Sequence, residues 1–140
     1  MTQWAIVDTG PLVAFLDRRE RFHTWAVAQI DQLERPLLVC EAVLTEAMFL
    51  LRHHPAAQDG ILAMLENGAL EIGFQLAPHS REIRELRRKY HDRPMSLADA
   101  CIVRMAELHD RHTVFTIDAD FGVYRKHGHE PLTLILPPGY

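Results

Sequence analysis

The chain has 140 residues, of which 48% are hydrophobic and 24% charged, so we expect one globular domain spanning residues 1–140. No apolar run reaches the roughly 20 residues that cross a bilayer, and the N-terminus lacks the pattern of a signal peptide, so we expect a cytoplasmic protein with no membrane segment. The net charge of −4 argues against a protein that coats DNA through a basic surface, and two cysteines are too few for a disulfide framework.

Short apolar runs alternate with longer helical patterns along the chain. The runs favour β-strands over residues 3–7, 36–40, 70–74, 112–116 and 132–136. Helices are expected from Pro11 onward, from Ser96 to about His109, and over residues 22–34, 41–53, 56–67 and 79–90. This alternation predicts an α/β fold with a mostly parallel sheet, in which ligands bind beyond the carboxyl ends of the strands.

Asp8 follows the first predicted strand in WAIVDTGPLVAFLD, residues 4–17. It could cap the helix that begins near Pro11, but Thr9 could serve as that cap as well. Asp-Thr-Gly is also a tripeptide of aspartic proteases. Those enzymes pair two such loops in a nearly all-β fold, which the alternating pattern does not predict.

Glu46 is the only charged residue in AVLTEAMFLL, residues 42–51, which is predicted to be a helix apolar on nearly every side. We therefore expect its carboxylate to be buried, and a buried carboxylate must be paired, protonated or bound to a cation. An arginine distant in the sequence is the alternative partner. Glu41, at the start of the same helix, has a simpler role beside the helix dipole.

Two later acids stand near a helix start and a strand end. Asp99 follows Ser96 by three residues, the spacing of a capping box, which alone would explain it. Asp118 follows the fourth predicted strand in VFTIDADFGVYR, residues 114–125, and Asp120 is the weaker candidate beside it.

Each acid has a structural explanation by itself, but their joint placement indicates a site. In a doubly wound sheet Asp8, Glu46, Asp99 and Asp118 would converge at one edge. Carboxylates that close repel one another unless cations neutralise them. Mg²⁺ or Mn²⁺ suits oxygen ligands, and such ions polarise a phosphodiester and lower the pKa of a bound water.

These motifs, in this order, resemble those of a PIN domain, and more narrowly of a VapC-type ribonuclease toxin of type II toxin–antitoxin systems. The four matching stretches are VDTGPLVAFLD, VLTEAMFLL, KYHDRPMSLADACIVRMAE and VFTIDADFGVYR. They place the acids of the family at Asp8, Glu46, Asp99 and Asp118. Two positions depart from the pattern of many relatives. Gly10 stands where they carry serine or threonine, and Ser96 stands where they often carry an acid.

The resemblance implies a three-layer α/β/α sandwich with a five-stranded parallel sheet in order 3-2-1-4-5. It also implies that the four acids hold Mg²⁺ or Mn²⁺ and that water hydrolyses RNA only when such an ion is bound. Thr9, Thr116 and Asp120 would support the four acids. A homodimer and a small antitoxin that covers or enters the acidic site are the implied partners. A catalytically weak or silent PIN-fold module that binds RNA or protein is the alternative.

Two groups of basic residues could bind phosphates. Arg18, Arg19 and Arg21 follow the first predicted helix and are the candidate RNA-binding residues. A second group gathers around the helix predicted over 79–90, where a solvated charged face is the simpler explanation: Arg81, Arg84, Arg87, Arg88, Lys89 and Arg93.

Two further classes of protein fit the sequence poorly. A haloacid-dehalogenase-like phosphatase would need a second aspartate two residues after Asp8, where Gly10 stands. The nine histidines do not form a Cys/His pattern with the spacing of a structural zinc site.

Overall fold

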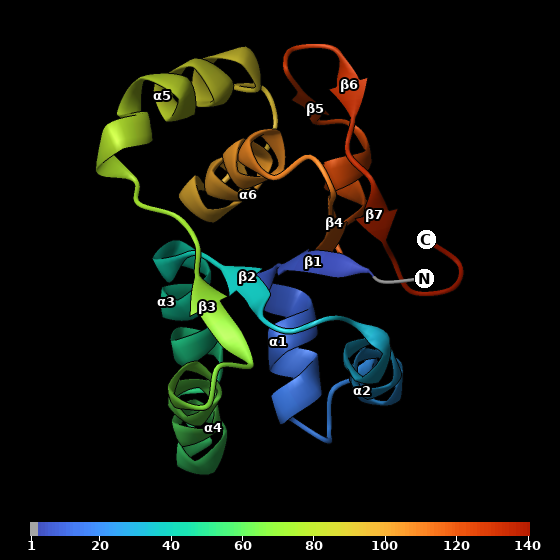
Figure 1. The fold of residues 1–140 in the computed structure, drawn as a ribbon. Coiled ribbons are helices and arrows are strands. Elements are labelled where there is room, and N and C mark those ends of the chain that lie inside the picture. The colour runs from blue at the N-terminus through green and yellow to red at the C-terminus, as the bar shows by residue number, and fades with distance from the viewer. Residues whose placement is uncertain (1–2) are drawn as a thin grey trace.

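Five parallel strands form the central sheet of the computed structural model, which describes residues 3–140. The sheet order is β3-β2-β1-β4-β7 (Figure 1), with these strand bounds: β1 Trp4–Val7, β2 Leu37–Val39, β3 Leu70–Ile72, β4 His112–Phe115 and β7 Leu134–Ile135. Because β7 is the fifth strand of this sheet, the predicted order 3-2-1-4-5 is confirmed. The sequence analysis missed a short antiparallel ribbon between β4 and β7, formed by β5 Arg125–Lys126 and β6 Glu130–Pro131.

Helices cover both faces of the sheet. Figure 1 shows α1, α2, α3 and α4 on one side of the strands and α5 and α6 on the other. Their bounds are α1 Thr9–Leu16, α2 His23–Gln32, α3 Glu41–Leu50, α4 Pro55–Glu66, α5 Ser80–Lys89 and α6 Leu97–Leu108, with 3-10 turns η1 Ala77–His79 and η2 Ala119–Gly122. All six predicted helices are present, and their ends differ from prediction by a few residues, as is usual where helices fray.

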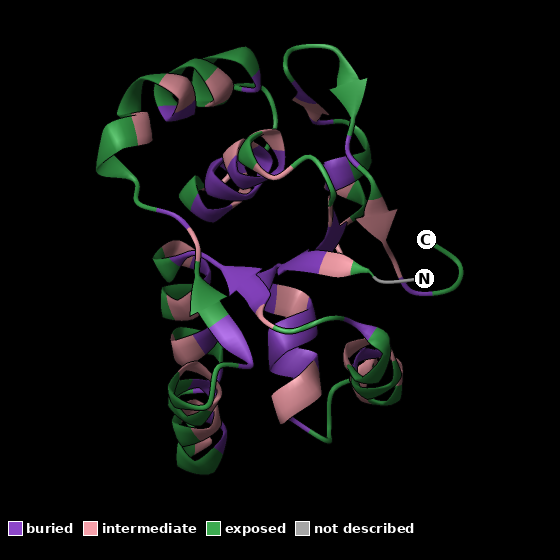
Figure 2. Cartoon of the chain, viewed as in Figure 1, coloured by how far each residue is buried: buried purple, intermediate pink, exposed green. Residues whose placement is uncertain are grey.

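The strands are apolar on both faces because helices pack on both. Ala5, Ile6 and Val7 of β1 are fully buried, which explains why the predicted strands lack the alternation of a half-exposed sheet. Figure 2 shows this buried layer in purple, while much of α5 is exposed. No helix within residues 3–140 is long and apolar enough to cross a membrane.

Local sequence signals set several helix ends. Helix α4 ends before Asn67-Gly68, and Gly68 has a φ of 84°, a conformation that glycine adopts readily. On α5, Ile83 is buried and Tyr90 is buried just beyond the helix, as their shared face predicts.

Candidate active site

Asp8 lies at the carboxyl end of β1 and is the N-cap of α1. Its Oδ1 accepts a hydrogen bond of 2.7 Å from the backbone N–H of Thr9, and its own N–H donates to the carbonyl of Phe115 on β4. The interpretation of Thr9 as the cap is wrong, because Thr9 is already the first residue of the helix. Capping orients the Asp8 carboxylate at the point where β1 and β4 both end.

Glu46 reaches this point from α3. The hydroxyl of Thr9 donates a hydrogen bond of 3.0 Å to Glu46 Oε2, across 37 positions of sequence. The expectation that Glu46 is buried is wrong. Glu46 is exposed. Helix α3 lies at the surface, where it buries only Val43 and Ala47 and leaves Phe49 62% exposed.

Thr116 links Asp8 to the segment that follows β4. Its hydroxyl is fully buried, donates 2.7 Å to Asp8 Oδ2 and accepts 2.9 Å from the backbone N–H of Asp118. Asp118 Oδ1 in turn accepts from the N–H of Asp120, which fixes the start of η2. Thr9 and Thr116 thus connect the carboxylates of Asp8 and Glu46 to the backbone at Asp118.

Asp99 lies in the first turn of α6. Ser96 Oγ accepts from the Asp99 N–H at 3.0 Å, and Asp99 Oδ2 accepts from the Ser96 N–H at 3.1 Å, so the predicted capping box is present. One oxygen of the half-buried Asp99 carboxylate is therefore engaged with its own helix. Because α6 is the crossover that precedes β4, it begins at the same edge of the sheet where β1 ends.

The acids affect one another's protonation. Burial raises the pKa of Asp8 from 3.8 to about 6; hydrogen bonds from Thr116 and Thr9 oppose the shift, and the charges of Asp99 and Asp118 add to it. Burial also raises the pKa of Asp99, and the charges of Asp118 and Glu46 contribute. The mutual repulsion expected for converging carboxylates is therefore present at this edge.

Tyr124 is a neighbour of the acids that the sequence analysis missed. It is fully buried, and within residues 3–140 its hydroxyl is the buried side-chain polar atom with no hydrogen-bond partner. Burial raises its pKa, and the charges of Asp99, Asp120 and Asp118 raise it further. Only its position six residues after Asp118, in a stretch already singled out, could have drawn attention to it.

The donors at this edge fit a hard divalent cation in kind. They are carboxylate and hydroxyl oxygens, the ligands that Mg²⁺ and Mn²⁺ prefer. The orphaned Tyr124 hydroxyl beside them is a polar atom that a hydrated ion could satisfy. Within residues 3–140, no group of three or more His, Cys, Asp or Glu side chains is gathered closely enough around one point to hold an ion as the side chains stand.

The first arginine group lies elsewhere. Arg18, Arg19 and Arg21 follow the C-terminal end of α1, whose eight residues separate them from Asp8 by about 12 Å of helix. The Arg19 guanidinium is paired with Asp17 at 3.2 Å, and that of Arg21 lies 4.9 Å from the ring centre of Phe22. The structure therefore does not bring these arginines together with the acids.

Comparison with known proteins gives the family. A model of the PIN domain matches residues 5–126, which include all four acids and both threonines. The chain belongs to the PIN domain family. It is similar to Ribonuclease VapC26 of Mycobacterium tuberculosis, with 30% identity over 115 residues that cover 81% of this chain and 85% of the relative.

Two solved structures share the fold of this chain. A crystal structure of Mycobacterium tuberculosis VapC20, described as a sarcin–ricin loop cleaving toxin, has a TM-score of 0.76 at 17% identity and covers 85% of this chain and 93% of its own. A chain of a toxin–antitoxin complex from Klebsiella pneumoniae has a TM-score of 0.61 at 21% identity, with coverage of 82% and 87%. The PIN assignment thus agrees in sequence and in architecture.

Proposed function

We propose that this PIN domain, residues 1–140, is an endoribonuclease that depends on Mg²⁺ or Mn²⁺ and acts as the toxin of a toxin–antitoxin pair. One observation carries the proposal: a continuous chain of hydrogen bonds runs from Glu46 through Thr9, Asp8 and Thr116 to Asp118. It joins acids from three separate segments at the carboxyl edge of the sheet, where α/β proteins bind ligands.

The acids have distinct positions in the proposed chemistry. Asp8, Glu46, Asp99 and Asp118 would hold the ion, which when bound polarises the phosphodiester and lowers the pKa of the attacking water. Asp8 is the most rigid of them because both of its oxygens accept hydrogen bonds. The Thr9 hydroxyl orients the Glu46 carboxylate, and the Thr116 hydroxyl fixes the Asp8 carboxylate relative to the Asp118 backbone.

Similarity supports RNA as the substrate class and an antitoxin as a partner. The relative with 30% identity is a ribonuclease by name, and a chain of the same fold comes from a toxin–antitoxin complex. A homodimer is proposed on the apolar side chains that α3 and α4 expose to solvent, among them Phe49 at 62%, Leu50 at 57% and Leu62 at 55%.

The test is cleavage of RNA by the purified protein. We expect cleavage with Mg²⁺ or Mn²⁺ and none with EDTA, and we expect Asp8→Asn and Asp99→Asn each to abolish it while the circular dichroism spectrum stays unchanged. Asp59→Asn, an exposed acid on α4, is the matched control and should cleave as wild type does. If both site variants cleave as well as wild type, the assignment of the acids is wrong.

The alternative function predicts a different pattern. A catalytically silent PIN-fold binding module would release no RNA fragments with either ion and would cause no growth arrest when expressed. Both observations together would reject the ribonuclease proposal in favour of the binding module.

A further inference from the structure

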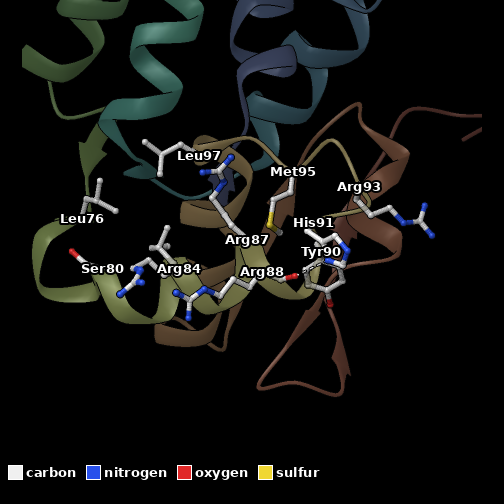
Figure 3. A pocket seen from close by; sticks show the side chains of 11 residues that line it. Leu76, Ser80, Arg84, Arg87, Arg88, Tyr90, His91, Arg93, Met95 and Leu97 are labelled. Carbon is white, nitrogen blue, oxygen red and sulfur yellow. Dashed lines mark hydrogen bonds between the residues drawn. The ribbon is translucent and has the colours of Figure 1, made fainter.

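A cavity of about 590 Å³ lies between α5 and the segment that connects it to α6 (Figure 3). Its basic lining consists of Arg84, Arg87, Arg88 and Arg93, and no acidic side chain from the described residues 3–140 lines it. Leucine, isoleucine and methionine side chains add apolar surface to the lining, and the exposed His91 also lines the cavity. A solvated helix face, the simpler explanation from sequence, does not account for this concave shape.

The four cavity arginines are free to bind. Within residues 3–140 none of them forms an ion pair or a side-chain hydrogen bond. By contrast, Arg81 is paired with Glu85 at 3.6 Å, and Arg104 with Glu107 at 3.1 Å. The four arginines that line the cavity are thus not neutralised by a carboxylate within residues 3–140.

The cavity reaches the start of α6, the helix that carries Asp99. Its lining includes Leu76, which follows β3, and Leu97, which opens α6 two residues before Asp99. Both leucines also line a second cavity of about 310 Å³, which reaches Thr45, the residue before Glu46. An RNA strand that leaves the arginines past Leu97 would approach Asp99, which lies two residues further along α6.

We propose that the cavity formed by Arg84, Arg87, Arg88 and Arg93 holds the phosphodiester backbone of the RNA beside the scissile bond. This inference rests on the proposed ribonuclease function. Guanidinium groups bind phosphates in a fork geometry, and imidazole and apolar surfaces accept stacked bases. An acidic peptide would use the charges but has no need of the stacking surface.

The experiment measures RNA binding directly, in EDTA, by fluorescence anisotropy of a labelled oligouridylate of about 20 nucleotides. The cavity variant carries Arg84→Gln, Arg87→Gln and Arg88→Gln. The matched control carries Arg35→Gln, Arg52→Gln and Arg111→Gln, the same change in charge at positions that do not line the cavity. All six positions are exposed, and thermal unfolding checks that both variants fold.

We expect the cavity variant to lose three phosphate contacts. Each contact on a single strand contributes about 0.7 to the slope of log K against log salt, so the slope falls by about 2. Between 1 M and 0.1 M KCl, this change corresponds to affinity about 100-fold weaker at 0.1 M. The control should change affinity by less than about threefold, and in cleavage assays the cavity variant should raise KM while keeping kcat.

Three outcomes would overturn the proposal: unchanged RNA affinity of the cavity variant, an equal loss in the control, or loss of poly-glutamate binding with RNA binding kept. The last result would assign the cavity to an acidic peptide. Binding is measured without cleavage, so a failure of ribonuclease activity in the wild type would leave this test decisive. Conversely, metal-dependent cleavage with unchanged binding by the cavity variant would reject the cavity alone.

Discussion

Replacing Asp8 with asparagine should make the metal-free protein more stable at alkaline pH, although it removes a site acid. In the folded protein the pKa of Asp8 is raised to about 6, above the 3.8 of an unfolded chain. The protonated form therefore favours folding, and this contribution is complete below pH 3.8 and is lost as pH rises through about 6.

The magnitude follows from that difference. A gap between pKa 3.8 and about 6 corresponds to about 3 kcal/mol at pH 8. Asparagine carries no charge there, its amide oxygen can still accept from the Thr9 N–H, and its NH₂ can donate to the Thr116 hydroxyl. We expect Asp8→Asn to gain about 2 to 3 kcal/mol in free energy of unfolding at pH 8 and almost nothing at pH 4.

Urea denaturation in EDTA at both pH values measures this gain, with Asp59→Asn as the control that should show none at either pH. Mg²⁺ at about 1,000 times its Kd should then reverse the order, because it would stabilise wild type by about 4.1 kcal/mol and the variant lacks the site. A loss of stability at pH 8, or a gain of equal size at pH 4, would refute the reasoning about Asp8.

Two further substitutions test the contacts around Asp8. Thr116→Val removes a buried hydroxyl that hydrogen-bonds Asp8 and the Asp118 N–H, so it should destabilise the fold by about 1 to 3 kcal/mol in urea denaturation. Thr133→Val, at an exposed position, should change the free energy of unfolding by less than about 0.5 kcal/mol. Equal effects of the two substitutions would contradict the role of Thr116. At Gly10, an added Cβ would lie 2.4 Å from Ile117 Cγ1, so Gly10→Ser should cost about 1 to 2 kcal/mol. Combining it with Ile117→Ala should make the two effects non-additive, and strict additivity in a double-mutant cycle would show that the two side chains do not compete for space.

The Gly10 contact also explains one departure from the family pattern. The resemblance implies a hydroxyl residue at this position, whereas here the Ile117 side chain occupies the space that such a residue would need. Neither residue shows this alone, because they lie on different segments that meet only when β1 and β4 pair.

Much of the architecture could be predicted before the fold was known. Unalternating apolar runs identify buried parallel strands, and the Ser96–Asp99 spacing identifies a capping box, because both depend on neighbours within a few residues. The order of the sheet came from the resemblance of ordered motifs to a family, whereas the four acids were singled out by their places along the predicted elements and then matched to those motifs. None of these predictions required knowing which side chains touch.

Burial and long-range partners were decided only by packing. Glu46 stands in an apolar segment, yet α3 lies at the surface and its carboxylate meets a threonine 37 positions away. Tyr124 and the cavity arginines became notable only once η2, α5 and the start of α6 were assembled near Asp99. Periodicity shows which face of a helix is apolar, but the tertiary structure determines what, if anything, covers that face.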